Sequence, residues 1–172
     1  MMSRMRVIAT GVAVLLAMQV TYTQDAGRRA ATPAPPQKAN TMKLPPLKRF
    51  PTPQAIVDEH MDAINHCDWN RLMAQFPDDV QFFLPGGQVV KGRVAVGELF
   101  QGFVKPVSEG GLCGLKFTPE QVFAVGNTIN VSWVATADFL AEPYRGADAY
   151  ETKDGLMQAQ VTTFDSKQFK LK

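Results

Sequence analysis

Three segments of the chain place hydrophobic residues at intervals of three and four positions, which is the spacing of a helix with one buried face. They are residues 54–67, 69–76 and 93–105. A Thr-Pro pair precedes the first segment and Asp68 precedes the second, and both are typical of helix N-termini. The pattern therefore predicts three helices, all in the first two thirds of the chain.

Strand-like segments alternate with turn residues through the rest of the chain. They are residues 80–85, 88–92, 115–125, 128–140, 143–152 and 156–165. Gly-Gly, Gly-Asn and Lys-Asp-Gly turns separate neighbouring strands. Helices first and longer strands later favour an α+β fold. We expect a cone: a strongly bent antiparallel sheet, with about three N-terminal helices enclosing a pocket.

The first 53 residues follow neither pattern. Two arginines precede an apolar run at residues 7–20, which is shorter than the roughly 20 residues of a membrane span. We predict an export signal over residues 1–24, and hence a secreted or periplasmic protein. Membrane attachment is expected only if the signal stays uncleaved. Residues 25–53 are rich in proline and basic residues, so they are interpreted as a disordered linker to a domain at 54–172.

The net charge of +2 conceals an uneven distribution. Residues 1–53 hold eight Lys/Arg and one acid, whereas residues 54–172 hold ten Lys/Arg and fifteen acids. Because the predicted domain is acidic, we do not expect it to bind nucleic acid.

Two cysteines, Cys67 and Cys113, lie in the predicted domain. An exported chain permits a disulfide between them, but two thiols alone do not decide between a bond and free thiols. Neither cysteine has a neighbouring cysteine or histidine at a zinc-finger spacing, so no metal site is expected. No phosphate-binding loop or nucleophile elbow is present, and no cofactor is expected.

Three stretches resemble the nuclear-transport-factor-2-like superfamily, in particular its SnoaL-like and ketosteroid-isomerase-like branch. They are "INHCDWNRLMAQFPDDVQFFLPGG", "KGRVAVGELF" and "GADAYETKDGLMQAQV". The resemblance implies the same cone fold around a pocket. It also places His60 where ketosteroid isomerases have an oxyanion-hole tyrosine, Asp148 at the acid of the penultimate strand, and Leu84 where they have the catalytic base. Because that base is absent, the likeness to SnoaL-like cyclases, which use an acid at the Asp148 position, is better.

Strand alternation places Asp148 on one face with Gly146 and Tyr150. Burial would raise the pKa of this carboxyl, and a cationic His60 beside it would lower that pKa, so the pair is a candidate general acid and base. Asp148 is otherwise an exposed strand residue or a structural partner of Arg145. The candidate substrate-binding residues are Tyr150, Tyr144, Trp133, Phe82, Leu84, Phe103 and Asp138. The tryptophan and phenylalanines fit a hydrophobic core equally well.

These observations leave two hypotheses for the function. The first is a cofactor-independent enzyme that moves a proton on a small hydrophobic or polycyclic molecule, as an isomerase, cyclase, dehydratase or hydrolase does. The second is a non-catalytic module that binds a ligand in the same cavity or forms a homodimer through the open face of the sheet. Fold alone does not decide between them.

Overall fold

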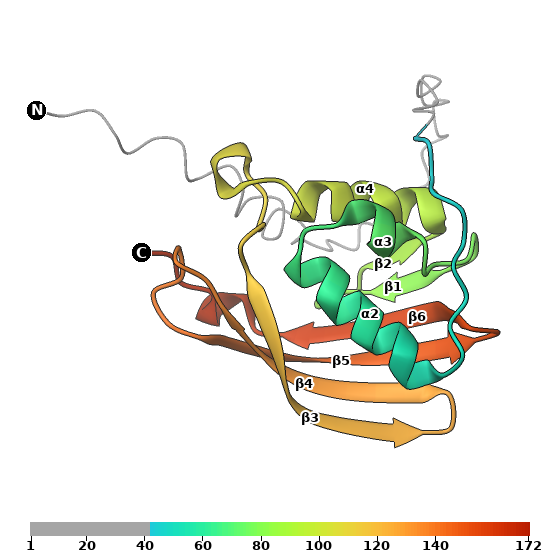
Figure 1. The fold of residues 1–172 in the computed structure, drawn as a ribbon. Helices are drawn as coiled ribbons and strands as arrows, with labels where there is room; N and C mark the ends of the chain where they lie inside the picture. Colours follow the sequence, from blue (N-terminus) through green and yellow to red (C-terminus); the bar gives the residue numbers. More distant parts are fainter. Residues whose placement is uncertain (1–41) are drawn as a thin grey trace, which may run out of the picture.

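The computed structural model describes residues 42–172, in which three α-helices cover one face of a curved six-stranded sheet (Figure 1). The helices are α2 (Pro53–Asn65), α3 (Trp69–Met73) and α4 (Arg93–Phe103). The strands are β1 (Gln81–Phe83), β2 (Val89–Lys91), β3 (Lys116–Val125), β4 (Thr128–Thr136), β5 (Tyr144–Lys153) and β6 (Leu156–Phe164). This is the α+β arrangement that the sequence predicts. The export signal predicted at 1–24 lies outside the described residues.

The first two helices, α2 and α3, begin where the sequence predicts. The Thr52 side chain accepts a hydrogen bond from the Ala55 amide, and Pro53 occupies the first turn of α2. Asp68 caps α3 in the same way by accepting from the Arg71 amide. No helix in residues 42–172 has the length and apolar character needed to cross a membrane.

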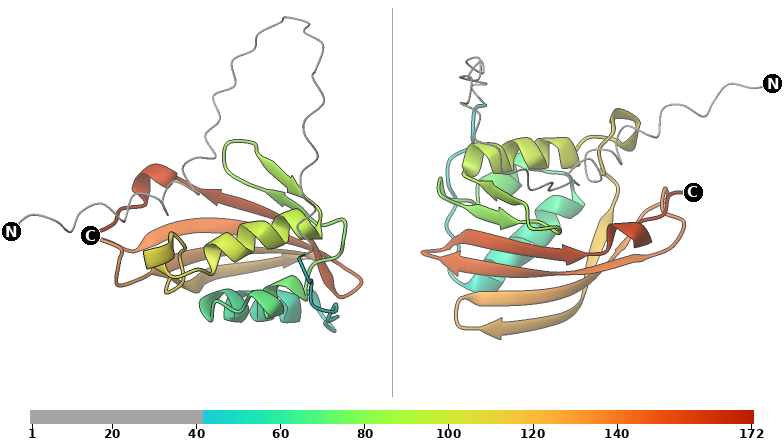
Figure 2. Two further views of the ribbon diagram at one scale, coloured as in Figure 1. Left: turned by 90° about the horizontal axis from the view of Figure 1, so that it is seen from above. Right: turned by 180° about the vertical axis from the view of Figure 1, so that it is seen from behind.

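The strand order is β2-β1-β6-β5-β4-β3, and one neighbouring pair differs from the antiparallel arrangement that the sequence predicts. β1 runs parallel to β6, while the other four pairs are antiparallel. Seen from behind, the short β1–β2 hairpin extends the sheet past β6 (Figure 2). Pairing between β1 and β6 joins segments far apart in the sequence, so no turn between them fixes its direction.

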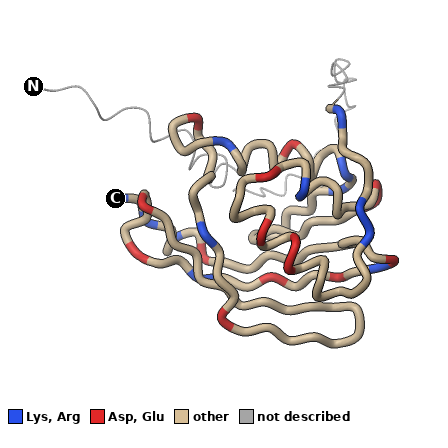
Figure 3. Tube along the Cα trace, viewed as in Figure 1, with Lys and Arg blue, Asp and Glu red and all other residues tan. Residues whose placement is uncertain are grey.

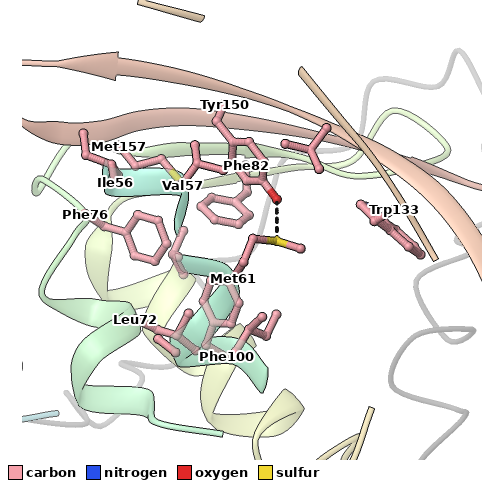
Figure 4. Close-up of a cluster of buried hydrophobic side chains, with 14 of the residues drawn as sticks. Ile56, Val57, Met61, Leu72, Phe76, Phe82, Phe100, Trp133, Tyr150 and Met157 are labelled. Atoms are coloured by element: carbon pink, nitrogen blue, oxygen red, sulfur yellow. Dashed lines mark hydrogen bonds between the residues drawn. The ribbon is translucent and has the colours of Figure 1, made fainter. Parts of the chain in front are cut away.

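An aromatic core fills the space between the helices and the β1 side of the sheet. The rings of Phe76, Phe82 and Phe100 pack with centroid separations of 5.2–5.6 Å (Figure 4). Phe82 is 2 % exposed and Phe76 is fully buried. Burying side chains of this size is the main favourable contribution to folding. Phe82, one of the candidate substrate-binding residues, therefore belongs to the core.

Residues 42–52, which we call the strap, pack along the helices and down to the start of α2 (Figure 1). The backbone amides of Lys48 and Phe50 donate to the carbonyls of Ala74 and Gly155. The sequence predicts a disordered linker up to residue 53, and this expectation is wrong for the strap. Its prolines favour an extended chain, but Leu44 and Phe50 also bury apolar surface against the core.

Arg93 holds the strap to the helices although no carboxylate pairs with it among the described residues. Its guanidinium donates to the Met73 carbonyl at 2.7 and 3.1 Å and to the Pro45 carbonyl at 2.6 Å. The side chain is only 8 % exposed, and this burial lowers the pKa of the guanidinium. The carbonyl groups thus replace the water that a buried cation needs.

Substituting Arg93→Met should lower the free energy of unfolding by about 1–3 kcal/mol, because it leaves two carbonyl groups without donors. We expect residues 42–50 to become susceptible to limited proteolysis at the same time. Arg145→Met is the matched control, since the pairing of Arg145 with Glu120 is solvent-exposed and worth little. Equal stability of the two variants in urea unfolding would contradict the role given to Arg93.

A disulfide joins Cys67, directly after α2, to Cys113 in the loop before β3, with a Cα–Cα distance of 5.7 Å. Of the two states that the sequence leaves open, the structure has the bonded one. Cys67 has a left-handed backbone (φ 54°), which lets the chain turn from α2 toward α3. The bond therefore fixes the end of α2 against residues 111–115, two elements that no strand pairing connects.

Candidate active site

A pocket opens between α2, the loop before β3 and the inner face of β4–β6. Its cavity volume is about 120 Å³. It is lined by His60, Met61, Ile64, Leu112, Leu115, Phe117, Trp133, Tyr144, Asp148, Tyr150, Gln160, Thr162, Phe164, Ser166 and Phe169. Apart from the neutral imidazole of His60 described below, the only ionisable group near neutral pH in this lining is the Asp148 carboxyl. Most of the pocket wall is therefore apolar, with polar groups concentrated around one acid.

Strand β5 turns Asp148 toward this pocket. Tyr144, Asp148, Tyr150 and Thr152 are buried along β5, while the residues between them are more exposed. Arg145 points the other way and pairs with Glu120 at 3.0 Å. The alternative interpretations of Asp148, an exposed residue or a partner of Arg145, are thus excluded, since only 8 % of its surface is exposed.

The two carboxylate oxygens of Asp148 have different surroundings. Oδ2 accepts hydrogen bonds from the Trp133 indole N–H at 3.0 Å and from the Tyr150 hydroxyl at 2.9 Å. Oδ1 is buried and has no hydrogen-bond partner among the described residues. Burial raises the pKa of this carboxyl to about 6, against the lowering effect of the hydrogen bond from Tyr150 and of the other polar side chains nearby. The carboxyl can therefore gain or lose a proton near neutral pH.

Gly146 makes the Trp133–Asp148 contact possible. Trp133 and Gly146 are register partners across β4 and β5, and a Cβ atom at Gly146 would lie 2.4 Å from the indole ring. With no side chain at this position, the ring lies flat over the strand and its N–H reaches the acid two residues further along. Strand alternation predicts that Gly146 shares a face with Asp148, but it does not predict this contact with Trp133.

His60 is buried beside this group but is not the cationic partner that the sequence analysis expects. Its ring lies 5.4 Å from that of Tyr150 and 5.9 Å from those of Phe76 and Phe100. Burial lowers the pKa of His60 to about 4, although the Gln75 side chain opposes this slightly. The imidazole is therefore neutral at physiological pH, and no ion pair with Asp148 occurs in the described chain. The expectation is wrong because desolvation outweighs any attraction to the acid.

The other candidate binding residues divide into two groups. Trp133, Tyr144 and Tyr150 line the pocket as expected. Outside it lie Phe82 in the core, Phe103 packed on Phe100 and Phe117, half-buried Leu84 at the end of β1, and Asp138. Asp138 is exposed and lines a separate surface groove with Cys113 and Lys116. These four residues are therefore not part of the pocket wall. The spacing of residues along a strand or helix does not show which part of that element reaches the pocket.

Sequence reasoning misses several residues of the pocket wall. Gln160 and Thr162 lie on β6 opposite Tyr150 and Asp148, and the Gln160 amide donates to the Thr162 hydroxyl at 3.1 Å. Strand alternation from the hairpin turn places both on the inner face, which is the signal that was available. Phe169 comes from the C-terminal segment, where the backbone pairs with residues 139–141. Nothing in its local pattern indicates that position.

The fold and the site together define a cone-shaped α+β domain with one sheltered acid in an apolar pocket. The model of the SnoaL-like domain family matches residues 57–160. This chain therefore belongs to the SnoaL-like domain family, and its fold is the one seen in NTF2-like proteins. A comparison with curated proteins gives no match.

Solved structures with the same fold are only distantly similar in sequence. An NTF2-like protein of unknown function from Cytophaga hutchinsonii is 15% identical, with TM-score 0.55, over 70% of this chain and 96% of that one. An LEH-like epoxide hydrolase of M. tuberculosis is 15% identical, with TM-score 0.54, over 68% and 85%. A computationally designed 17-OHP binder is 18% identical, with TM-score 0.58, over 72% and 98%. At sequence identities of 15–18%, the similarity shows that the fold is shared and nothing more.

Proposed function

We propose that this SnoaL-like domain binds a small, mostly apolar molecule and meets one polar group of it with Asp148. The observation that carries the proposal is the Asp148 Oδ1 atom, which is buried at an apolar pocket and has no hydrogen-bond partner among the described residues. A buried polar atom without a partner is costly unless something else satisfies it. A ligand in the pocket is well placed to do so.

The size of the cavity favours a molecule of about one ring. A cavity of about 150 Å³ in another protein holds one benzene molecule, whereas drug-sized ligands occupy roughly 300–1,000 Å³. The volume of this pocket, about 120 Å³, is close to that of the benzene-binding cavity and below that of drug-sized pockets. Of the small and polycyclic ligands considered from the sequence, the small ones are therefore favoured.

The second candidate function is proton transfer on that ligand without a cofactor. It is favoured by the pKa of Asp148 at about 6, because a general acid or base works best near the ambient pH. Tyr150 would hold the carboxyl in place, and the neutral His60 would shape the wall beside it. The similar epoxide hydrolase from M. tuberculosis supports chemistry in such a pocket, but this chain has Leu84 where ketosteroid isomerases have their base.

A thermal-shift screen of single-ring compounds, followed by calorimetry, should identify ligands whose affinity falls at least tenfold in Asp148→Asn. This variant keeps the shape of the side chain but removes its charge and its ability to exchange a proton. If the ligand is turned over, the same variant should lose turnover with its fold intact. Asp138→Asn is the control, because that carboxyl is exposed and outside the pocket. Unchanged affinity in Asp148→Asn would remove Asp148 from the site.

We also propose that the chain acts outside the cytoplasm. The disulfide supports this, because such bonds persist mainly in oxidising compartments. The homodimer expected from the sequence stays a prediction. Phe123 and Val161, which are 60 % and 44 % exposed on the outer face of the sheet, are residues that such a dimer would cover.

A further inference from the structure

Four of the hydrogen-bond donors that surround the pocket are already used within the protein. Trp133 and Tyr150 donate to Asp148, and the Tyr144 hydroxyl donates to the Asp165 carbonyl. The Gln160 amide donates to Thr162. The Thr162 and Ser166 hydroxyls, which can both donate and accept, and the second N–H of the Gln160 amide remain for a ligand.

Two polar atoms at the pocket that are left without a partner are acceptors. Asp148 Oδ1 and Gln160 Oε1 are both unpartnered, and their residues are only 8 % and 6 % exposed. A third polar atom without a partner is His60 Nδ1, which accepts in one tautomer of the neutral ring and donates in the other. Asp148 and Gln160 lie on neighbouring strands, with Gln160 opposite Tyr150 in the register of β5 and β6. A group that donates two hydrogens can therefore engage both residues.

A continuous row of aromatic rings stands beside these acceptors. Phe117 and Trp133 are 5.0 Å apart between centroids, Trp133 and Tyr144 are 5.9 Å apart, and Tyr144 is 5.2 Å from Phe169. The faces of aromatic rings attract cations. No lysine or arginine lines the pocket in the described part of the chain. Acidic residues also outnumber basic ones over residues 54–172, and Figure 3 marks both kinds along the described chain.

We propose, on the basis of the binding function above, that the ligand is a small organic amine. Its ammonium group donates to Asp148 Oδ1 and Gln160 Oε1, and its apolar body lies against the aromatic row. A carboxylate ligand would meet the negative charge of Asp148 and no lysine or arginine that could pair with it in the described lining. A purely apolar ligand would leave both acceptors unpaired.

Met61 lines the pocket close to the tyrosine that holds the acid. Its sulfur lies 3.7 Å from the Tyr150 hydroxyl, between α2 and the sheet (Figure 4). Asp148 Oδ1 is almost completely covered in this arrangement. Methionine side chains are unbranched and change conformation readily, so we expect Met61 to move aside when an ammonium group enters.

Three compounds with the same ring test this proposal: benzylamine, benzyl alcohol and benzoate. In calorimetry at pH 7.5, benzylamine should bind the protein at least tenfold more tightly than benzyl alcohol, and benzoate should not bind. The preference for the amine should disappear in Asp148→Asn and persist in Asp138→Asn. It should also weaken as the pH is lowered to 5, because the carboxyl becomes protonated below its pKa of about 6.

The possible results separate the two proposals. If benzyl alcohol or benzoate binds as tightly as benzylamine, or if Asp148→Asn keeps the preference, the amine proposal is wrong while the pocket still binds ligands. If none of the three compounds binds, the proposal that the pocket binds a single-ring ligand is contradicted. Circular dichroism of Asp148→Asn distinguishes a lost contact from a lost fold.

Discussion

The Asp148→Asn variant should lose about 3 kcal/mol of stability as the pH falls from 6.5 to 4, because His60 is then the uncompensated buried group. Burial lowers the pKa of His60 from 6.5 to about 4 in the folded protein. Between these two pH values the unfolded chain binds a proton at this histidine and the folded chain does not. Protonation of His60 therefore favours the unfolded state, and the free energy of unfolding decreases as the pH is lowered.

The His60→Phe variant should show the opposite trend. In the folded protein the pKa of Asp148 is raised from 3.8 to about 6, so on acidification the folded state takes up this proton first. Its contribution is present below about pH 4 and is lost as the pH rises to 6, a change of about 3 kcal/mol. Phenylalanine suits the site because rings of Phe76, Phe100 and Tyr150 already surround it.

In the wild-type protein these two contributions should nearly cancel. Between pH 4 and 6 the folded state holds one proton on Asp148 and the unfolded state holds one on His60. The two states therefore bind the same number of protons at these two residues. Urea unfolding of the three proteins at several pH values measures the effect. The comparison between variants removes the contribution of the surface carboxylates, which all three share. A flat profile in Asp148→Asn would show that His60 is not shielded from water as the structure indicates.

This compensation bears on how the site tolerates a carboxyl in an apolar pocket. Between about pH 4 and 6 the buried acid and the buried imidazole are both uncharged and avoid most of the cost of desolvation, and above pH 6 only the carboxyl is charged. The neutral His60 can then contribute packing next to Tyr150, which in turn holds Oδ2 of Asp148. The two residues cooperate through Tyr150 and not as an ion pair.

The sequence was sufficient for features that depend on local periodicity. Helix α2 begins at a Thr-Pro pair, and strand alternation placed Asp148 on the same face as Gly146 and Tyr150, although it did not show which face is buried. Both depend on residues within a few positions of one another, where side-chain geometry is fixed by the backbone. The position of His60 on the pocket side of α2 also followed, but from the family resemblance.

Features that depend on contacts between distant segments were not predictable in this way. The hydrogen bond from Trp133 to Asp148 requires Gly146 across the strand pair, and the docking of the strap requires the buried Arg93. The residues that flank Gly146 and Arg93 in the sequence do not indicate which distant groups these two residues contact. The protonation state of His60 likewise depends on complete burial by Phe76, Phe100 and Tyr150, which come from three other elements.

Breaking the Cys67–Cys113 disulfide should lower the free energy of unfolding by about 4 kcal/mol. The two cysteines are separated by 46 positions, and a cross-link of this length restricts the unfolded chain by about this amount in the chain-entropy description. The Cys67→Ala/Cys113→Ala protein and the wild-type protein in dithiothreitol should be destabilised to a similar extent. Dithiothreitol should have no effect on the double variant, which provides the control.

The same change should weaken ligand binding, because Cys113 lies between two residues of the pocket wall, Leu112 and Leu115. The disulfide is the only covalent contact that ties this wall to α2 in the described chain, and α2 supplies Met61 and Ile64 on the opposite side. We therefore expect reduction to lower ligand affinity at temperatures where the protein is still folded. If reduction changes stability by less than 1 kcal/mol and leaves affinity unaltered, the backbone hydrogen bonds from Leu112 to Phe103 and from Cys113 to Lys105 are sufficient to hold the wall.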